Sequence, residues 1–166
     1  ILYATDSSPI ALEDCLNAEG IGSLILSPNE KYLVLHKFGW EWSKPYMLNI
    51  DTGKYVFGDK TEIKDIEVLK DIKWSPDNNN FFVTTDVNEM GGIGEMGIYV
   101  SAYNNPDKIK KIWSTKNIYS NEIKSVIFVG NNKLKIQTEQ SDEESLPRKS
   151  INYEYDYKQD KLVVVD

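Results

Sequence analysis

The chain reads Leu24-Ile25-Leu26-Ser27-Pro28-Asn29-Glu30-Lys31-Tyr32-Leu33-Val34 and, further on, Ile72-Lys73-Trp74-Ser75-Pro76-Asp77-Asn78-Asn79-Asn80-Phe81-Phe82-Val83. Both stretches place a Ser-Pro step and a few polar residues between two apolar runs, and the two serines lie 48 residues apart (75 − 27). A third stretch, Val126–Ile136, keeps the apolar runs without Ser-Pro, and its Val129 follows Ser75 by 54 residues (129 − 75). A period of roughly 40–50 residues is typical of stacked repeats, which bury their apolar faces only against one another.

Each repeat predicts four β-strands. Proline fits the second position of a tight turn and the polar residue after it completes the turn, so each Ser-Pro step predicts a hairpin. The first strands of the repeats, Leu24–Leu26, Ile72–Trp74 and Val126–Phe128, are expected at equivalent inner positions and buried. From the apolar runs and turn residues, the expected strands span residues 23–26, 31–37, 46–50 and 54–57, then 71–74, 81–85, 97–102 and 108–114, and finally 124–128, 133–138, 150–155 and 161–165.

The two Ser-Pro stretches resemble the Trp-Ser-Pro-Asp-Gly-Lys turn that joins the first two strands of blades in TolB-like and dipeptidyl-peptidase-type (WD40-like) β-propellers. Trp74-Ser75-Pro76-Asp77 matches that turn best, while Glu30 and Asn78 replace its glycine and the third repeat lacks Ser-Pro. The resemblance covers about residues 21–165. It implies an all-β fold of three propeller-like, four-stranded antiparallel blades, and it transfers no catalytic residue.

The repeats predict one β-propeller-like domain over residues 1–166. It divides into an N-terminal strand or segment (residues 1–20) and blades at residues 21–58, 70–114 and 123–166. Closed propellers typically have about 4–8 blades, so we expect this partial propeller to be completed by the N-terminal segment or by a second copy. Apolar strands on the end faces of a three-blade array would favour a homodimer.

Composition and charge restrict the class of partner. The chain has 40% hydrophobic residues, enough for a core, and a net charge of −7. An acidic balance disfavours nucleic acid and anionic membrane surfaces, because both attract basic faces. No stretch reaches the roughly 18 apolar residues of a membrane-spanning helix, and Cys15 is the only cysteine. Because the sequence begins with Ile1, either a leader has been removed by processing or the chain has been trimmed, and we slightly favour an extracytoplasmic location.

The longest connections predict the binding surface. They join the second and third strands of each repeat, at residues 38–45, 86–96 and 139–149, and should gather on one face. Their formal charges are 0, −3 and −2, together −5 of the net −7. Indole rings beside carboxylates suit a protein or a small polar ligand. The candidate binding residues are Trp40, Glu41, Trp42, Asp86, Glu89 and Glu95.

Several motifs point to chemistry, and each has a structural alternative that we prefer. Gly92-Ile93-Gly94-Glu95-Met96-Gly97 fits a dinucleotide fingerprint, but the residues after it read as a strand instead of the required helix. His36 lies inside an expected strand, and the Asp142-Glu143-Glu144 run lacks the spacing of a calcium loop. No nucleophile elbow, zinc pair or phosphate-binding loop is present. We therefore predict no catalytic residue, no metal site and no cofactor.

The sequence favours a non-enzymatic binding or protein-interaction module that uses an acidic, Trp-containing loop face. The alternative is an accessory or partial domain of a propeller-containing enzyme of peptidase or glycan-processing type, with the catalytic residues elsewhere.

Overall fold

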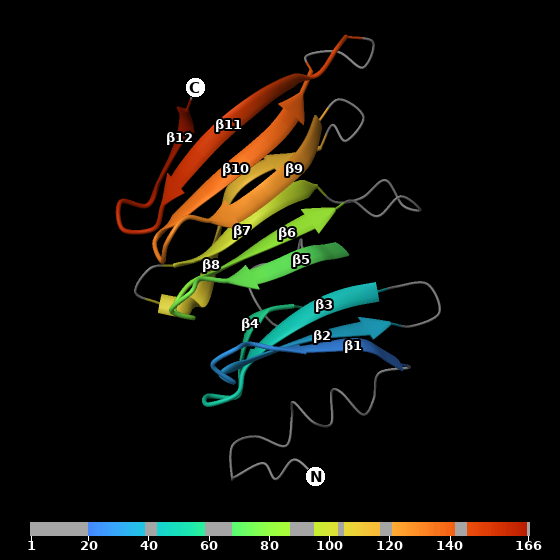
Figure 1. Ribbon diagram of the computed structural model, residues 1–166. Helices are drawn as coiled ribbons and strands as arrows, with labels where there is room; N and C mark the ends of the chain where they lie inside the picture. The colour runs from blue at the N-terminus through green and yellow to red at the C-terminus, as the bar shows by residue number, and fades with distance from the viewer. Residues whose placement is uncertain are drawn as a thin grey trace. The chain divides into compact units, whose positions relative to one another are not determined.

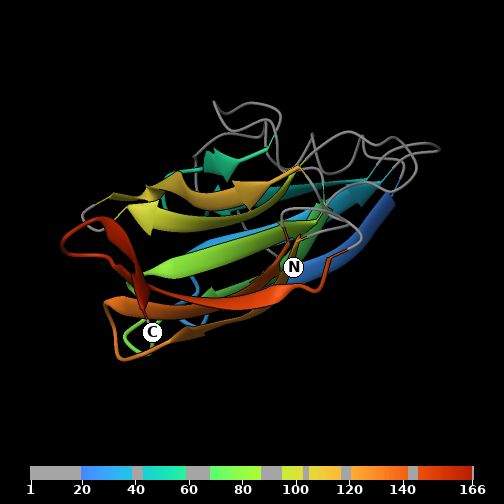
Figure 2. The same ribbon diagram turned by 90° about the horizontal axis from the view of Figure 1, so that it is seen from above.

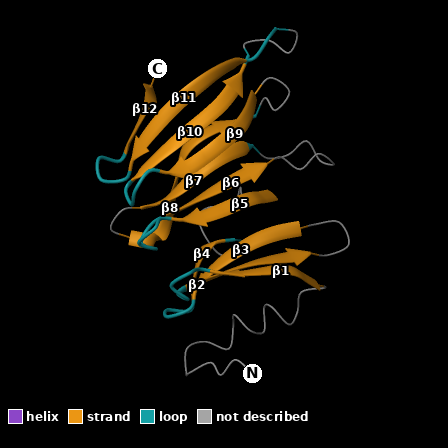
Figure 3. Cartoon of the chain, in the orientation of Figure 1, coloured by secondary structure: helices purple, strands orange, loops and turns teal. Residues whose placement is uncertain are grey.

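The computed structural model describes residues 20–38, 43–58, 68–86, 95–102, 105–116, 121–141 and 146–165. In these ranges the regular structure is entirely β-strand, arranged as three four-stranded antiparallel sheets (Figures 1 and 3). Each sheet is formed by strands that are consecutive in the chain, which is the strand order of a propeller blade. The predicted all-β fold of three four-stranded sheets is confirmed.

All twelve expected strands are present, and several extend beyond the predicted ends. The first sheet contains β1 (Gly20–Leu26), β2 (Tyr32–Phe38), β3 (Ser43–Asn49) and β4 (Lys54–Phe57). The second contains β5 (Val68–Trp74), β6 (Phe81–Asp86), β7 (Met96–Ala102) and β8 (Asn105–Thr115). The third contains β9 (Asn121–Phe128), β10 (Lys133–Gln140), β11 (Lys149–Asp156) and β12 (Lys161–Val165). Because β3 begins at Ser43, the connection after β2 is shorter than predicted.

The two Ser-Pro turns have the same hydrogen bonds. The Ser27 amide donates to the Tyr32 carbonyl over 2.9 Å, and the Tyr32 amide donates to Ser27 Oγ over 2.9 Å. Ser75 and Asn80 repeat this pair of bonds at 2.8 and 3.0 Å. Both serines are buried, so their hydroxyls satisfy backbone groups that water cannot reach. The serine side chain therefore closes the hairpin in both turns.

The residue that replaces glycine in each Ser-Pro turn has a positive φ. Glu30 and Asn78 both have φ of 59°, and Gly130 has φ of 68° in the third repeat. The left-handed region costs roughly 1–2 kcal/mol for most side chains, whereas asparagine tolerates it better. The resemblance to a glycine-containing turn thus correctly identifies a position of backbone strain.

We predict that Glu30→Gly stabilises the first sheet by about 0.5–1 kcal/mol, because relief of left-handed strain exceeds the added flexibility of the unfolded chain. Asn78→Gly is the matched control and should change the free energy of unfolding by less than half as much. Urea-induced unfolding followed by circular dichroism measures both effects. A lower stability of Glu30→Gly would contradict the prediction.

The chain divides into two compact units, at residues 1–69 and 70–166. In the first unit, the paired residues Val34, Met47 and Phe57 lie in one row across β2, β3 and β4 and are almost fully buried. On the other face of this sheet, the Lys37 ammonium lies 4.7 Å from the centre of the Tyr46 ring. Tyr46 in turn meets Tyr55 edge-on, with ring centres 5.9 Å apart.

The second unit has a core between the second and third sheets, and Figure 2 shows the same strands from above. Apolar residues interdigitate between the two sheets, as in other face-to-face packings. The Tyr157 hydroxyl also donates to the Phe81 carbonyl over 2.7 Å and so joins the β11–β12 turn to β6. The buried members of this core are Phe82, Met96, Ile98, Val100, Ile123, Val126, Leu134, Ile136, Tyr155 and Tyr157.

The first strands occupy equivalent places, at one edge of each sheet, but the prediction that all three segments are buried was wrong. At the equivalent positions, Ile72 and Val126 are 7% and 6% exposed, whereas Leu24 is 62% exposed. Leu26 is also exposed, and so is Ile127. A side chain in an edge strand has a neighbouring strand on one side only. Its burial therefore depends on whether another sheet packs over it.

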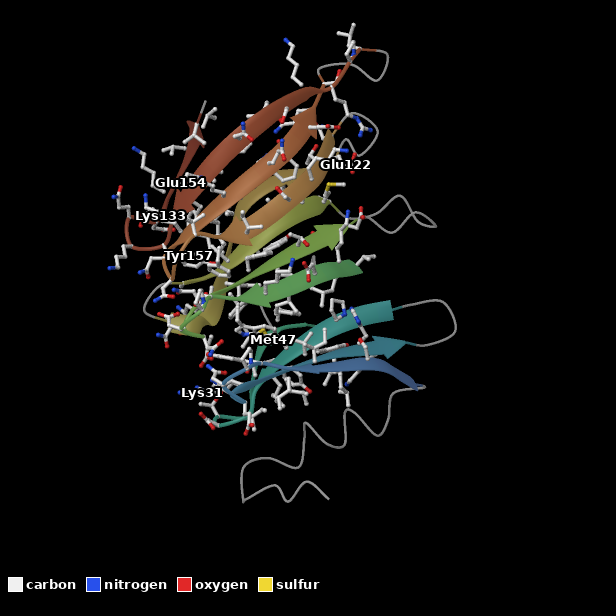
Figure 4. All side chains as sticks on the ribbon, in the orientation of Figure 1. Lys31, Met47, Glu122, Lys133, Glu154 and Tyr157 are labelled. Carbon is white, nitrogen blue, oxygen red and sulfur yellow. The ribbon has the colours of Figure 1, made fainter. Side chains whose placement is uncertain are left out.

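The third sheet has one buried apolar face and one exposed face that carries charges. Along β10, buried Leu134, Ile136 and Thr138 alternate with exposed Lys133, Lys135 and Gln137. Lys133 forms an ion pair with Glu154 of β11 on the exposed face (Figure 4). The same face also carries exposed Ile127 and Val163 in one cross-strand row with Lys135 and Glu154, so this end face is mixed, partly apolar and partly charged.

Candidate functional site

Two of the six predicted binding residues lie at the strand ends that flank the β6–β7 connection. Asp86 is the last residue of β6, and Glu95 comes directly before β7. The Thr85 hydroxyl donates to the Glu95 carbonyl over 3.1 Å, which fixes the backbone where the connection returns to the sheet. Trp40, Glu41, Trp42 and Glu89 lie outside the described residues.

Both described carboxylates lie beside lysines of flanking strands. Asp86 Oδ2 is 3.7 Å from Lys70 Nζ of β5, and Glu95 forms an ion pair with Lys111 of β8. Burial opposes ionisation of Glu95, but hydrogen bonds from Lys111 and Ser114 and the charge of Lys111 outweigh it, so the net effect is a lowered pKa. Glu95 is therefore an ionised, positioned carboxylate.

Sequence reasoning missed these lysines because it counted charges along the loops only. Lys70 and Lys111 lie in strands on either side of β6 and β7. The pairing of four consecutive strands brings them to the carboxylates. The strand register follows from the turns. It could have indicated that lysines in the neighbouring strands partly balance the negative charge of the loops.

A second group of charges lies at the β10–β11 end of the third sheet. Lys124 Nζ is 2.9 Å from Glu122 and 3.1 Å from Glu139, and Arg148 is 3.0 Å from Glu122. The hydrogen bond from Lys124 is the largest cause of a lowered pKa at Glu122. Among the described residues, two carboxylates and two cations balance here, while Asp142, Glu143 and Glu144 of the same connection lie outside the described residues.

These groups can bind charged partners, but they do not have the properties of a general acid. A carboxyl that donates a proton near neutral pH needs a raised pKa. Glu95 and Glu122 both have lowered values because lysines stabilise the ionised form. The chemistry that the described carboxylates support is ion pairing.

The remaining sequence candidates lie in structural settings. His36 Nδ1 is 3.0 Å from Ser23 Oγ on the neighbouring strand, and burial lowers the pKa of the imidazole. The strand β7 follows the glycine-rich stretch, so the helix that dinucleotide binding requires is not there. Among the described residues, no three His, Cys, Asp or Glu side chains are placed to hold a metal ion. In the same ranges no helix is long and apolar enough to cross a membrane.

A lysine, an aspartate and a tyrosine link the second and third sheets. Lys110 of β8 lies 2.8 Å from both carboxylate oxygens of Asp160, and the Tyr155 hydroxyl donates to Asp160 Oδ1 over 2.6 Å. The Lys110 hydrogen bond, followed by that from Tyr155, lowers the pKa of Asp160. Burial and the Asp160 contact raise the pKa of Tyr155. Because both partners of Asp160 come from packed strands, this cluster is structural.

Comparison with known proteins gives only solved structures. No protein-family model matches the chain, and no curated protein matches its sequence. Similar structures include a protein assigned as TolB from Agrobacterium tumefaciens, with 12% identity and a TM-score of 0.44 over 89% of this chain and 50% of that one. The isopeptidase AtxE2 has 12% identity and a TM-score of 0.46 over 89% of this chain and 30% of that one. A protein assigned as a conserved lipoprotein from Clostridium novyi NT has 15% identity and a TM-score of 0.45 over 90% of each chain.

The chain spans half of the TolB structure and less than a third of the isopeptidase. Strand order and turns define this chain as an all-β repeat protein of propeller-like sheets.

Proposed function

We propose that the chain is a non-enzymatic binding or protein-interaction module, and that its recognition surface is the acidic, Trp-containing loop face. The observation that carries the proposal is the placement of Asp86 and Glu95 at the strand ends beside the β6–β7 connection. Rigid strands that present ionised groups at a loop are a common basis for recognition. Glu89 lies within this connection, and Trp40, Glu41 and Trp42 lie in the equivalent connection of the first repeat.

The partner that suits this surface is a cationic protein or a small polar ligand. Carboxylates attract basic groups at a distance, and an indole ring adds apolar contact and cation–π attraction to lysine or arginine. An extracytoplasmic location and a role as accessory domain of a larger enzyme stay predictions from the sequence.

We predict that Trp40→Ala combined with Trp42→Ala weakens binding of an octalysine peptide about tenfold, because indole contacts to cations are lost. Titration calorimetry at low salt measures the affinity. Glu154→Gln, on the exposed face of the third sheet, is the matched surface control and should leave the affinity within twofold. Unchanged affinity together with a lower melting temperature would mean that the two tryptophans are core residues and would contradict the proposed surface.

A further inference from the structure

Among the described residues, no strand pairs with the outer edge of β1. This strand lies at one end of the order β1-β2-β3-β4, and its seven residues, Gly-Ile-Gly-Ser-Leu-Ile-Leu, include no charge and no proline. Leu24, Ile25 and Leu26 are 62%, 39% and 51% exposed. Edge strands of natural sheets normally carry charges or proline, which prevent pairing with another chain.

The equivalent strands of the other repeats have this protection. β5 contains Lys70, Asp71 and Lys73, and β9 contains Glu122 and Lys124. Counted back from the shared turn position, Ile25 of β1 corresponds to Lys73 of β5 and to Ile127 of β9 (27 − 2, 75 − 2 and 129 − 2). β1 thus differs from the two strands at the equivalent place in the other sheets, and the difference is that β1 has no charged residue.

The opposite end of the repeat series does not complement β1. The outer face of the third sheet presents Lys133, Lys135 and Glu154 beside exposed Ile127 and Val163, so any partner on this face would have to cover three charges. An array of copies joined from the first sheet of one to the third sheet of the next would bury these charges, which is costly. The chain therefore favours a symmetric contact in which the same surface of two copies meets.

We propose that β1 pairs antiparallel with β1 of a second copy about a two-fold axis, so that two four-stranded sheets join into one of eight strands. Antiparallel pairing satisfies the edge amides and carbonyls of both copies. No like charges meet, because the strand has none, and the apolar side chains of Leu24 and Leu26 extend across the joint on one face. Two-fold symmetry closes the contact, so the assembly stops at two copies.

The joint is small, because seven residues at about 3.3 Å each give a shared edge of about 23 Å. A contact of this size is expected to be reversible and to show a dissociation constant in the micromolar range. The proposal concerns the strand edge only and is independent of the acidic loop face.

Sedimentation velocity of the full chain between about 1 and 200 µM tests the proposal. We expect the 19.0 kDa species to be replaced by a species of twice that mass as concentration rises. Ile25→Lys restores the charge found in β5 and should raise the dissociation constant at least tenfold. Ile127→Lys, the same substitution at the equivalent position of β9, is the matched control and should leave the constant within twofold.

Hydrogen exchange of the unmodified chain gives a second readout that does not depend on folding of a variant. Amides of residues 20–26 should exchange more slowly at 200 µM than at 1 µM, while β9 amides should not change. A monomer at all concentrations overturns the proposal, and so does a dimer that Ile127→Lys weakens and Ile25→Lys does not. Slow exchange of β1 in a monomer would mean that another segment of the same chain covers the edge, which also overturns it.

Discussion

Tyr157→Ala is expected to lower the free energy of unfolding of residues 70–165 by about 3–5 kcal/mol, the cost typical of removing a large buried aromatic side chain. Tyr157 is 1% exposed and lies in the turn between β11 and β12. Its ring stacks on Phe128 at 6.0 Å and meets Tyr155 edge-on at 5.1 Å. The substitution thus opens a cavity between the second and third sheets, where the core of this unit lies.

Tyr157→Phe separates the ring from the hydroxyl. It keeps the packing and removes the hydrogen bond to the Phe81 carbonyl, so the cost should fall to about 1–2 kcal/mol. Urea-induced unfolding followed by tyrosine and tryptophan fluorescence compares the two variants. Equal losses for both would show that the hydroxyl, and not the packing, holds the sheets together.

Tyr157 also predicts that the stability of residues 70–165 decreases at alkaline pH. Burial, followed by the influence of Tyr155, raises the pKa of the Tyr157 phenol above its ordinary value of about 10. Because the pKa of Tyr157 is higher in the folded chain, this tyrosine ionises at a lower pH in the unfolded chain. Its contribution to the free energy of unfolding is therefore fully present below pH 10 and falls as the pH rises above 10. The slope for this one tyrosine approaches about 1.4 kcal/mol per pH unit. Tyr157→Phe should unfold with a shallower dependence on pH between 9 and 11, and an unchanged slope would contradict the assignment.

The strands could be predicted because their signals are local. A Ser-Pro step, two flanking apolar runs and the alternation of residues 151–156 each depend on neighbours in the chain, and the repeat confirms them by recurrence. The turn hydrogen bonds of Ser27 and Ser75 are equally local. Even the departures from the family pattern were informative, because Glu30 and Asn78 replace glycine where φ is positive.

Burial and ion pairing could not be predicted in the same way because they depend on which sheets meet. Leu24 and Val126 belong to the same pattern, yet one is exposed and the other is in the core. Lys70 and Lys111 reach Asp86 and Glu95 across strands that the loop count ignored. The repeat pattern predicts where each strand lies, whereas the neighbouring sheet determines which of its side chains are buried and which groups they contact.

Gly58→Ala is expected to destabilise the first sheet by about 3–5 kcal/mol, from two independent causes. Gly58 has φ of 126°, a region open to glycine and costing other residues roughly 1–3 kcal/mol. An added Cβ would also overlap Cδ1 of Tyr46, and overpacking of this kind costs about 1–3 kcal/mol. Tyr46 cannot easily move away, because the Lys37 ammonium and the Tyr55 ring hold it.

Gly130→Ala separates the two causes. Gly130 has φ of 68°, but an added Cβ would meet nothing within 4 Å, so only the backbone cost of about 1–2 kcal/mol applies. Thermal and urea-induced unfolding of both variants, each compared with the unmodified chain, measures the difference. If Gly58→Ala cost no more than Gly130→Ala, the contact between Gly58 and Tyr46 would not restrict the chain. The larger loss expected at Gly58 would instead mean that the backbone after β4 packs directly against the Tyr46 ring of β3, where there is no room for a side chain.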